Sequence, residues 1–334
     1  MGTNTQEQPT DSRFPILLRD VRHDISRYKL IQSLSILSFR RQALVNEPAS
    51  LEPRQTFAYG VASVFCPPWH RKQGYTKHMM RLLHYVLASP GLLPPFPPEW
   101  GAPPAPPPGT GNACFSALWS DIGSTYYEAC GPTLDHLGWK VKEPIATVWK
   151  TDSTAKAAGD VRWLSEEDCV KLWRHDTHYI RDQLAGYQSP DELFIRCTFL
   201  PDNGVAAFQM RRSKFFLPGL PSVPIPEKWG VIIPGLSQPT YATWTTDIRP
   251  LPVALLITRI RASAETLPML LSAIMVAATG NGAATVEVWN LEQHLLETAH
   301  ELSGLTAQRD EHLSALAWYG SGNIDDIRWC FNQK

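Results

Sequence analysis

Apolar and polar positions in the first third of the chain change their period near residue 70. Over residues 56–65 both faces of a period-2 pattern are largely apolar, which predicts a central strand of a sheet. Over residues 79–87 the apolar positions follow the i, i+3, i+4, i+7 spacing of a helix packed on a sheet, with Lys77, Arg81 and His84 on its polar side. The pattern therefore predicts a strand, a loop and an amphipathic helix, in that order.

The same patterns predict further strands and helices. The expected strands are 34–39, 113–119, 161–164, 194–200, 205–211, 241–248, 253–261, 285–289 and 315–319. The expected helices are 124–130, 165–184 with a capping box at its start, 266–278 and 291–302. Because strands and helices alternate, we expect an α/β chain of the α+β type, with a mixed sheet flanked by helices.

Proline and glycine mark the irregular parts of the chain. Residues 90–108 are dense in proline, and we expect an exposed insertion without regular secondary structure there. Residues 201–204, Pro-Asp-Asn-Gly, predict a hairpin between the strands 194–200 and 205–211. Residues 215–239 are also rich in proline and are expected to be irregular.

The order of elements suggests two related domains. Strand and helix alternate after residue 253 as they do after residue 56, so the second half is expected to repeat the first fold. The repeat has no glycine over residues 261–266, where the first half has Gly74. We expect a short, partly disordered segment at 1–33, a first domain at 34–147 and a second domain at 148–334.

Composition excludes several classes of function. The net charge of −1 and the lack of a long basic run argue against nucleic-acid binding. The six cysteines form no C-x-x-C pair and residues 1–13 carry no apolar signal region, so we expect reduced thiols in the cytoplasm. The longest apolar runs are too short to span a membrane. His175 and His178 have no third ligand nearby in sequence, so no metal site is expected.

The loop before the amphipathic helix is the strongest candidate for ligand binding. It contains Arg71-Lys72-Gln73-Gly74-Tyr75-Thr76. A helix that begins after a glycine-containing loop offers free N–H groups and the positive end of its dipole to a diphosphate. Arg71 and Lys72 add positive charge. An ordinary turn between a strand and a helix explains the same residues without any ligand.

A second candidate is the tyrosine pair Tyr126 and Tyr127 in the segment 118–131. Acylation of an amine by a thioester needs an amine that has lost a proton, a polarised carbonyl and a proton for the departing thiolate. Tyr127 could supply that proton, and main-chain N–H groups around residues 63–66 could polarise the carbonyl. The alternative is that both tyrosines are core aromatic residues of a short helix.

These segments resemble the GNAT superfamily of acetyltransferases. Arg71-x-x-Gly74-x-Thr76 is similar to its acetyl-CoA signature Q/R-x-x-G-x-G/A, with threonine at the last position. Residues 127–131, Tyr-Glu-Ala-Cys-Gly, are similar to its final motif. Pro132 stands where that motif has an aromatic residue, and Gly138-Trp139 offers one later.

The narrower resemblance is to the fungal-type lysine N6-acetyltransferase family. It rests on residues 60–66, 71–80 and 118–123 and on the C-terminal Phe-Asn-Gln-Lys, and it covers most of residues 36–334. It implies a GNAT-like first domain followed by a second, degenerate GNAT-like unit. It also implies acetyl-CoA as acyl donor and direct transfer to a small amine, with the ε-amino group of L-lysine as the best candidate.

The resemblance assigns roles to individual residues. Val64, Phe65 and Cys66 would bind the pantetheine and acetyl group through their main chain. The main-chain N–H groups of Arg71, Lys72, Gln73, Gly74, Tyr75 and Thr76 would hold the diphosphate. Tyr127 would be the general acid for the CoA thiolate.

Two alternatives stay open. The acceptor could be an amine of a specialised metabolite. The chain could instead be a non-catalytic relative that binds CoA or a partner protein. The second alternative arises because only residues 1–33 precede the first expected strand, where the superfamily has a strand and one or two helices that form part of the acceptor site.

Overall fold

The computed structural model describes residues 34–48, 50–187, 193–202, 206–219, 223–248 and 251–333. The expected N-terminal segment 1–33 lies outside these residues. The chain forms two compact units, which are discontinuous in sequence. Unit 1 contains residues up to Gln42, Thr56–Val141 and Leu313–Ile324, and unit 2 contains Ala43–Gln55, Lys142–His312 and the residues from Asp325 onward.

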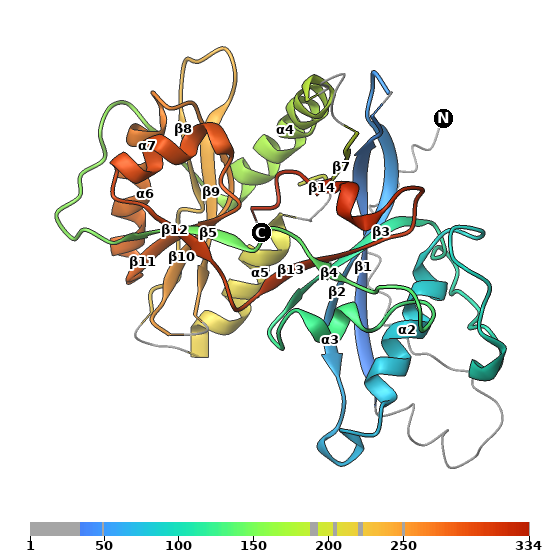
Figure 1. Ribbon diagram of the computed structural model, residues 1–334. Coiled ribbons are helices and arrows are strands. Elements are labelled where there is room, and N and C mark those ends of the chain that lie inside the picture. Colours follow the sequence, from blue (N-terminus) through green and yellow to red (C-terminus); the bar gives the residue numbers. More distant parts are fainter. Residues whose placement is uncertain are drawn as a thin grey trace, which may run out of the picture. The chain divides into compact units, whose positions relative to one another are not determined.

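The described strands form two sheets. Their bounds are β1 Ser35–Asn46, β2 Arg54–Phe65, β3 Ala113–Ser120, β4 Lys140–Val141, β5 Ile145–Lys150, β6 Arg162–Leu164, β7 Ile195–Phe199, β8 Gly230–Ile233, β9 Thr240–Asp247, β10 Ala254–Arg261, β11 Thr285–Trp289, β12 Leu305–Gln308, β13 Leu313–Trp318 and β14 Ile327–Trp329. One sheet has the order β14-β7-β1-β2-β3-β13-β4 and the other β12-β5-β11-β10-β9-β8-β6 (Figure 1). Both mix parallel and antiparallel pairs.

Helices flank these sheets. They are α2 Tyr75–Leu87, α3 Thr125–Glu128, α4 Glu166–Gly186, α5 Ala207–Phe216, α6 Leu267–Gly280 and α7 Leu296–Glu301. The expected capping box of α4 is present, because the side chains of Ser165 and Asp168 each accept a main-chain N–H from the other residue. The expected α/β fold of mixed sheets with flanking helices is thus confirmed. Within the described part of the chain, none of the helices has the length and hydropathy that crossing a bilayer requires.

Unit 1 is built around a crossover from β2 through α2 to β3. β2 and β3 are parallel, and β13 adds an antiparallel partner to β3 over its whole length. The helix buries Met80, Leu83 and Leu87 in the core of this unit. His84 was expected on the polar side of the helix, and this expectation is wrong because its side chain is 0% exposed.

Unit 2 contains the same kind of crossover. β10 and β11 are parallel and are joined through α6, whose buried residues belong to the core of this unit. β9 precedes β10 as an antiparallel neighbour. The second half therefore repeats the strand–helix–strand order of the first, as its sequence pattern suggested.

Two expectations about local structure are wrong. Residues 207–216 form α5 rather than a strand, because Ala207, Met210 and Ser213 share a buried helical face. Residues 215–239 contain the strand β8. β5 and β12 were not expected at all.

The proline-rich insertion is only partly exposed. It contains a 3-10 turn, Pro98–Trp100, and its aromatic side chains lie against α2. Phe96 contacts Tyr85 edge to face, and Trp100 contacts His78 in the same way. The expectation of an exposed insertion is therefore wrong for these aromatic positions, because the sequence pattern does not show that they cover a helix.

Candidate functional site

The end of β2 forms one side of the candidate site. β2 pairs with β3 from Phe57 to Gly60, and no described β3 residue pairs with β2 beyond that point, although both strands continue. Ser63 has a φ of 53°, in the left-handed region that non-glycine residues rarely adopt. Val64 is half-buried and Phe65 is exposed. The main chain after Gly60 is therefore free of the β3 ladder where the acetyl group is expected to bind.

The loop after β2 is held by its own hydrogen bonds. Arg71 donates from Nε to the Cys66 carbonyl at 3.1 Å, and Gln73 donates from Nε2 to the Trp69 carbonyl at 3.0 Å. Gly74 is the N-cap of α2 with a φ of 83°, a conformation that glycine adopts without strain. No side chain caps the helix, and its first turn has no acidic residue. Its first N–H groups therefore lack an intrahelical partner and a side-chain cap.

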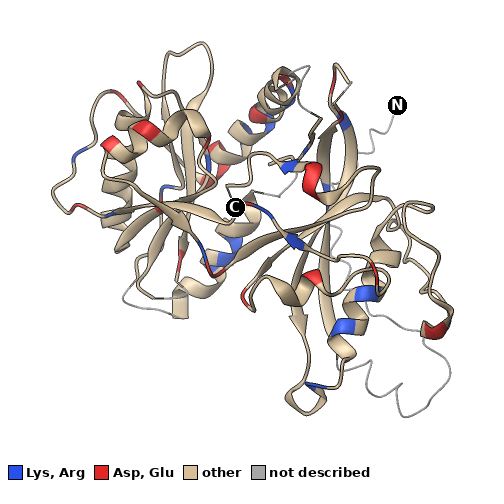
Figure 2. Cartoon of the chain, viewed as in Figure 1, with Lys and Arg blue, Asp and Glu red and all other residues tan. Residues whose placement is uncertain are grey.

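The loop and helix α2 themselves carry only basic charges. Residues 66–87 contain no aspartate or glutamate, whereas Arg71, Lys72, Lys77 and Arg81 are cationic. Figure 2 shows α2 with blue positions and no red ones. The helix dipole and these cations act in the same direction, so the residues present fit a diphosphate.

The two tyrosines of α3 are not equivalent. Their rings meet edge to face with centroids 5.2 Å apart, and both are half-buried. Burial raises the pKa of Tyr126, while the Thr76 side chain, in the first turn of α2, lowers it by hydrogen bonding. The structure thus brings Tyr126 to the first turn of α2, a contact that no sequence pattern indicated.

Tyr127 keeps its proton at neutral pH. Burial raises its pKa to about 12, with smaller contributions from Tyr126, Cys130 and Asp121. Its carbonyl accepts the main-chain N–H groups of Cys130 and Trp139, both at 3.1 Å. A Cβ at Gly138 would lie 2.4 Å from this carbonyl oxygen, so only glycine fits there.

His84 belongs to a buried chain of hydrogen bonds in unit 1. Its Nε2 lies 2.8 Å from the Cys130 carbonyl, and its Nδ1 lies 3.1 Å from the Tyr319 hydroxyl. The Tyr319 hydroxyl lies 2.6 Å from Ser116 Oγ, which accepts from Trp139 Nε1 at 3.0 Å. Burial lowers the pKa of His84 to about 4, so the ring is neutral at pH 7.

The chemistry of the end groups fixes every proton in this chain. A carbonyl only accepts, so His84 donates from Nε2 and accepts at Nδ1. Tyr319 must then donate to His84, and Ser116 must donate to Tyr319. The indole of Trp139 only donates, which completes the chain at its other end.

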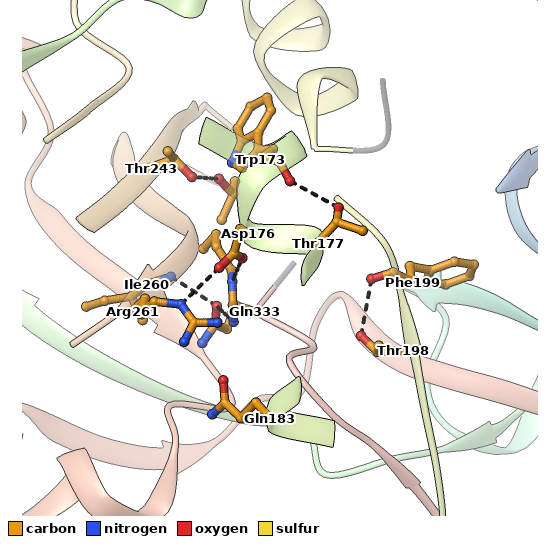
Figure 3. Close-up of polar contacts among 12 residues, drawn as sticks. Trp173, Asp176, Thr177, Gln183, Thr198, Phe199, Thr243, Ile260, Arg261 and Gln333 are labelled. Carbon is orange, nitrogen blue, oxygen red and sulfur yellow. Dashed lines mark hydrogen bonds and ion pairs between the residues drawn. The ribbon is translucent and has the colours of Figure 1, made fainter. Parts of the chain in front are cut away.

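Unit 2 has a charged cluster in its interior (Figure 3). Asp176 accepts from Arg259 Nε at 2.8 Å and from Arg261 Nε at 2.9 Å. Burial alone raises the pKa of Asp176, but the two guanidinium groups outweigh it and lower the pKa. Gln333 accepts from the Ile260 N–H at 3.0 Å. This cluster ties α4, β10 and the C-terminal residues of unit 2 together.

Metal ligation finds no support in the described structure. His175 and His178 lie on α4 as the sequence indicated. The described residues contain no group of three or more histidine, cysteine, aspartate or glutamate side chains that could hold an ion.

Comparison with known families identifies the class of protein. Residues 146–334 match the family model described as the LYC1 GNAT-like C-terminal domain. The expected resemblance to the GNAT superfamily of N-acetyltransferases is therefore confirmed. Since the match covers more than half of the chain, the protein belongs to the LYC1-like GNAT family. No curated protein matches the chain by sequence.

Solved structures that align with this chain have low sequence identity to it. A GCN5-related N-acetyltransferase from Kribbella flavida has a TM-score of 0.45 and 11% identity, covering 88% of this chain and 62% of that one. One from Anabaena variabilis has a TM-score of 0.46 and 10% identity, with coverages of 89% and 64%. A probable N-acyltransferase from Enterococcus faecalis has a TM-score of 0.46 and 10% identity, covering 88% of this chain and 65% of that one. The chain thus spans less than two thirds of the length of these proteins.

Proposed function

We propose that the protein is an acetyl-CoA-dependent N-acetyltransferase that acts on a small free amine in the cytoplasm, with the ε-amino group of L-lysine as the leading acceptor. The observation that carries this proposal is the uncapped, basic start of α2 after Gly74, within the same unit as Tyr127. Membership of the LYC1-like GNAT family supports the acetyl-CoA donor. The lysine acceptor is supported by the sequence resemblance to fungal-type lysine N6-acetyltransferases.

The residues of unit 1 suit the parts of such a reaction. Acetyl-CoA supplies an activated acetyl thioester. The main-chain N–H groups at the start of α2 would bind its diphosphate, and the main chain of Val64 to Cys66 would orient the acetyl group. The amine nitrogen would form a bond to the acetyl carbon as the C–S bond breaks, and Tyr127, protonated at neutral pH, would donate its hydroxyl proton to the leaving sulfur. The proton that the amine loses would pass to solvent, from which the tyrosine is reprotonated. No covalent intermediate on the protein is needed.

The test is release of free thiol from acetyl-CoA by the purified protein, with L-lysine and a panel of other amines. We expect release with lysine and formation of N6-acetyl-lysine, identified by mass. Release with other amines alone would retain the transfer reaction and reject lysine as acceptor. Saturable CoA binding without release for any amine would reject catalysis and favour the non-catalytic alternative.

Tyr127→Phe tests the acid role. We expect kcat to fall roughly 10²- to 10⁴-fold, because the leaving thiolate loses its proton donor. The Kd for CoA should change little. Full activity in this variant would exclude Tyr127 from the role.

A further inference from the structure

The main chain of Tyr127 is held by two residues that both contact His84. Its carbonyl accepts the N–H groups of Cys130 and Trp139. His84 binds the carbonyl of Cys130 through Nε2. The same imidazole stacks on the ring of Trp139, with centroids 4.2 Å apart and planes inclined by 24°. One buried side chain of α2 therefore touches both donors to the Tyr127 carbonyl.

We propose that His84, held by Tyr319, is a positioning residue for Tyr127: it fixes Cys130 and Trp139, which in turn fix the tyrosine. This inference rests on the proposed function, in which Tyr127 donates a proton. Neither His84 nor Tyr319 is proposed to touch the substrate.

The hydrogen-bond chain has a single direction, and this gives it the rigidity that positioning requires. Protons point from Trp139 through Ser116, Tyr319 and His84 to Cys130, and the chain cannot reverse because Trp139 only donates and the carbonyl only accepts. A buried network in which each linking bond is made specifies one arrangement, whereas a partly satisfied one is costly. The turn also requires glycine at 138, since a Cβ there would lie 2.4 Å from the Tyr127 carbonyl oxygen.

The same helix also carries the expected diphosphate site. Gly74 precedes the first turn of α2, and His84 lies in its last turn. Helix α2 thus links the loop at residues 71–76, where the diphosphate is expected, to the residues that hold Tyr127. Small displacements of a catalytic group lower turnover strongly, because the reaction needs the group within hydrogen-bonding reach.

A matched pair of tyrosine variants tests the proposal by kinetics. Tyr319 and Tyr59 are both buried in unit 1. Tyr59 donates to Asn112 Oδ1 at 2.9 Å and does not belong to the hydrogen-bond chain of His84. We expect Tyr319→Phe to lower kcat roughly tenfold or more while KM for acetyl-CoA changes less than about twofold. Tyr59→Phe loses a similar buried hydroxyl and should keep wild-type kcat. Equal kcat in the two variants would overturn the proposal.

A second comparison uses His84 itself. Gln can donate to the Cys130 carbonyl and accept from Tyr319, whereas Leu can do neither. We expect His84→Gln to retain much more of kcat than His84→Leu, with both proteins folded at the assay temperature. Equal loss in the two variants would contradict positioning through these hydrogen bonds.

Amide hydrogen exchange separates a failure of this proposal from a failure of the proposed function. In Tyr319→Phe the amides of Cys130 and Trp139 should exchange faster than in Tyr59→Phe, whether or not the protein transfers acetyl groups. Unchanged exchange of these amides would overturn the positioning. Faster exchange in a protein that acetylates no amine would keep the positioning of Tyr127 and reject its catalytic use. Nitrogen NMR of the wild-type His84 imidazole should show the proton on Nε2. A proton on Nδ1 would contradict the proposed direction of the hydrogen bonds and overturn the proposal.

Discussion

Helices α2 and α6 occupy equivalent places in their units but differ in the residues at which they begin. Each follows a strand and leads to a parallel neighbour. α2 begins after a left-handed glycine, without a side-chain cap. α6 also has no side-chain cap and no acidic residue in its first turn, but the Ser263 N–H just before it is bonded to Thr266 Oγ1 at 2.8 Å. The Leu267 N–H is bonded to the Ser263 carbonyl at 3.0 Å, and Pro268 has no N–H.

This difference indicates where the proposed binding of CoA would depend on individual residues in a repeated fold. The first N–H groups of α2 are available to the proposed diphosphate. At α6 the Leu267 N–H is bonded to the Ser263 carbonyl and Pro268 has no N–H. The crossover itself is common to both units, so a function of this kind depends on a few residues at the helix start and not on the fold.

The buried polar groups of the two units also differ. Unit 1 contains a neutral chain of hydrogen bonds that ends beside Tyr127, and unit 2 contains an ion cluster around Asp176. The first positions a residue of the candidate site, and the second joins elements of its own unit. Four experiments probe this contrast.

Asp176→Asn should have the largest effect on stability. It leaves two guanidinium groups buried without their carboxylate, which we expect to cost about 3–5 kcal/mol of unfolding free energy. The Kd for CoA, measured on protein that is still folded, should not change. Urea unfolding is the measurement, with the exposed Asp160→Asn as control. A small loss would show that the cluster tolerates an uncompensated charge.

Acid should weaken unit 1 through His84. Its pKa is lowered to about 4 in the folded protein from an unfolded value of 6.5, so the unfolded chain binds more protons between these values. The stabilisation is complete above pH 6.5 and is lost as pH falls through 4, on the order of 3 kcal/mol. Urea midpoints at pH 7, 6, 5 and 4 would measure this. His84→Gln should flatten the slope, and an unchanged slope would exclude His84 as its cause.

Gly74→Leu should weaken the proposed binding of CoA at the start of α2. A side chain there is strained at a φ of +83° and obstructs the approach of the diphosphate. Calorimetric titration should show CoA affinity at least about tenfold weaker, or ~1.4 kcal/mol. Gly91→Leu is the control, because Gly91 has a φ of +82° and also no atom within 4 Å of an added Cβ. Equal affinities for the two variants would remove the loop from the site.

Thr266→Ala should have the smallest effect. It removes the hydrogen bond with the Ser263 N–H before α6, at a cost of about 1 kcal/mol. CoA affinity should be unchanged, because this helix start is not expected to bind the donor. Weaker CoA binding in this variant would show that α6 has retained the role of α2.

Sequence patterns were sufficient for the parts of the chain where one signal dominates. β2 and α2 were predicted because their apolar positions follow one period without interruption. The prediction of a strand after the hairpin signal was wrong, since the turn residues at 201–204 were weighted above the helical spacing of Ala207 and Met210. When a turn signal and a helical spacing lie next to each other, the local sequence does not show which of them determines the structure.

The candidate site was predictable only as far as main-chain chemistry determines it. Gly74 could be recognised, because a helix start needs a particular residue type at a particular place. His84 could not, because a histidine among apolar residues is assigned to solvent unless its distant partners are known. Those partners include Tyr319, which is 235 positions away in sequence. Asp176 was missed for the same reason, between two histidines that suggested an exposed face.

The place of β13 in unit 1 bears on how the chain folds during synthesis. β13 pairs with both β3 and β4, and Tyr319 follows it directly. The ribosome therefore makes nearly all of unit 2 before the strand that completes unit 1. Until then β3 is an unprotected edge, the kind of surface on which nascent chains associate wrongly. The order of translation thus leaves unit 1 incomplete, and open to chaperones, until most of unit 2 has been made.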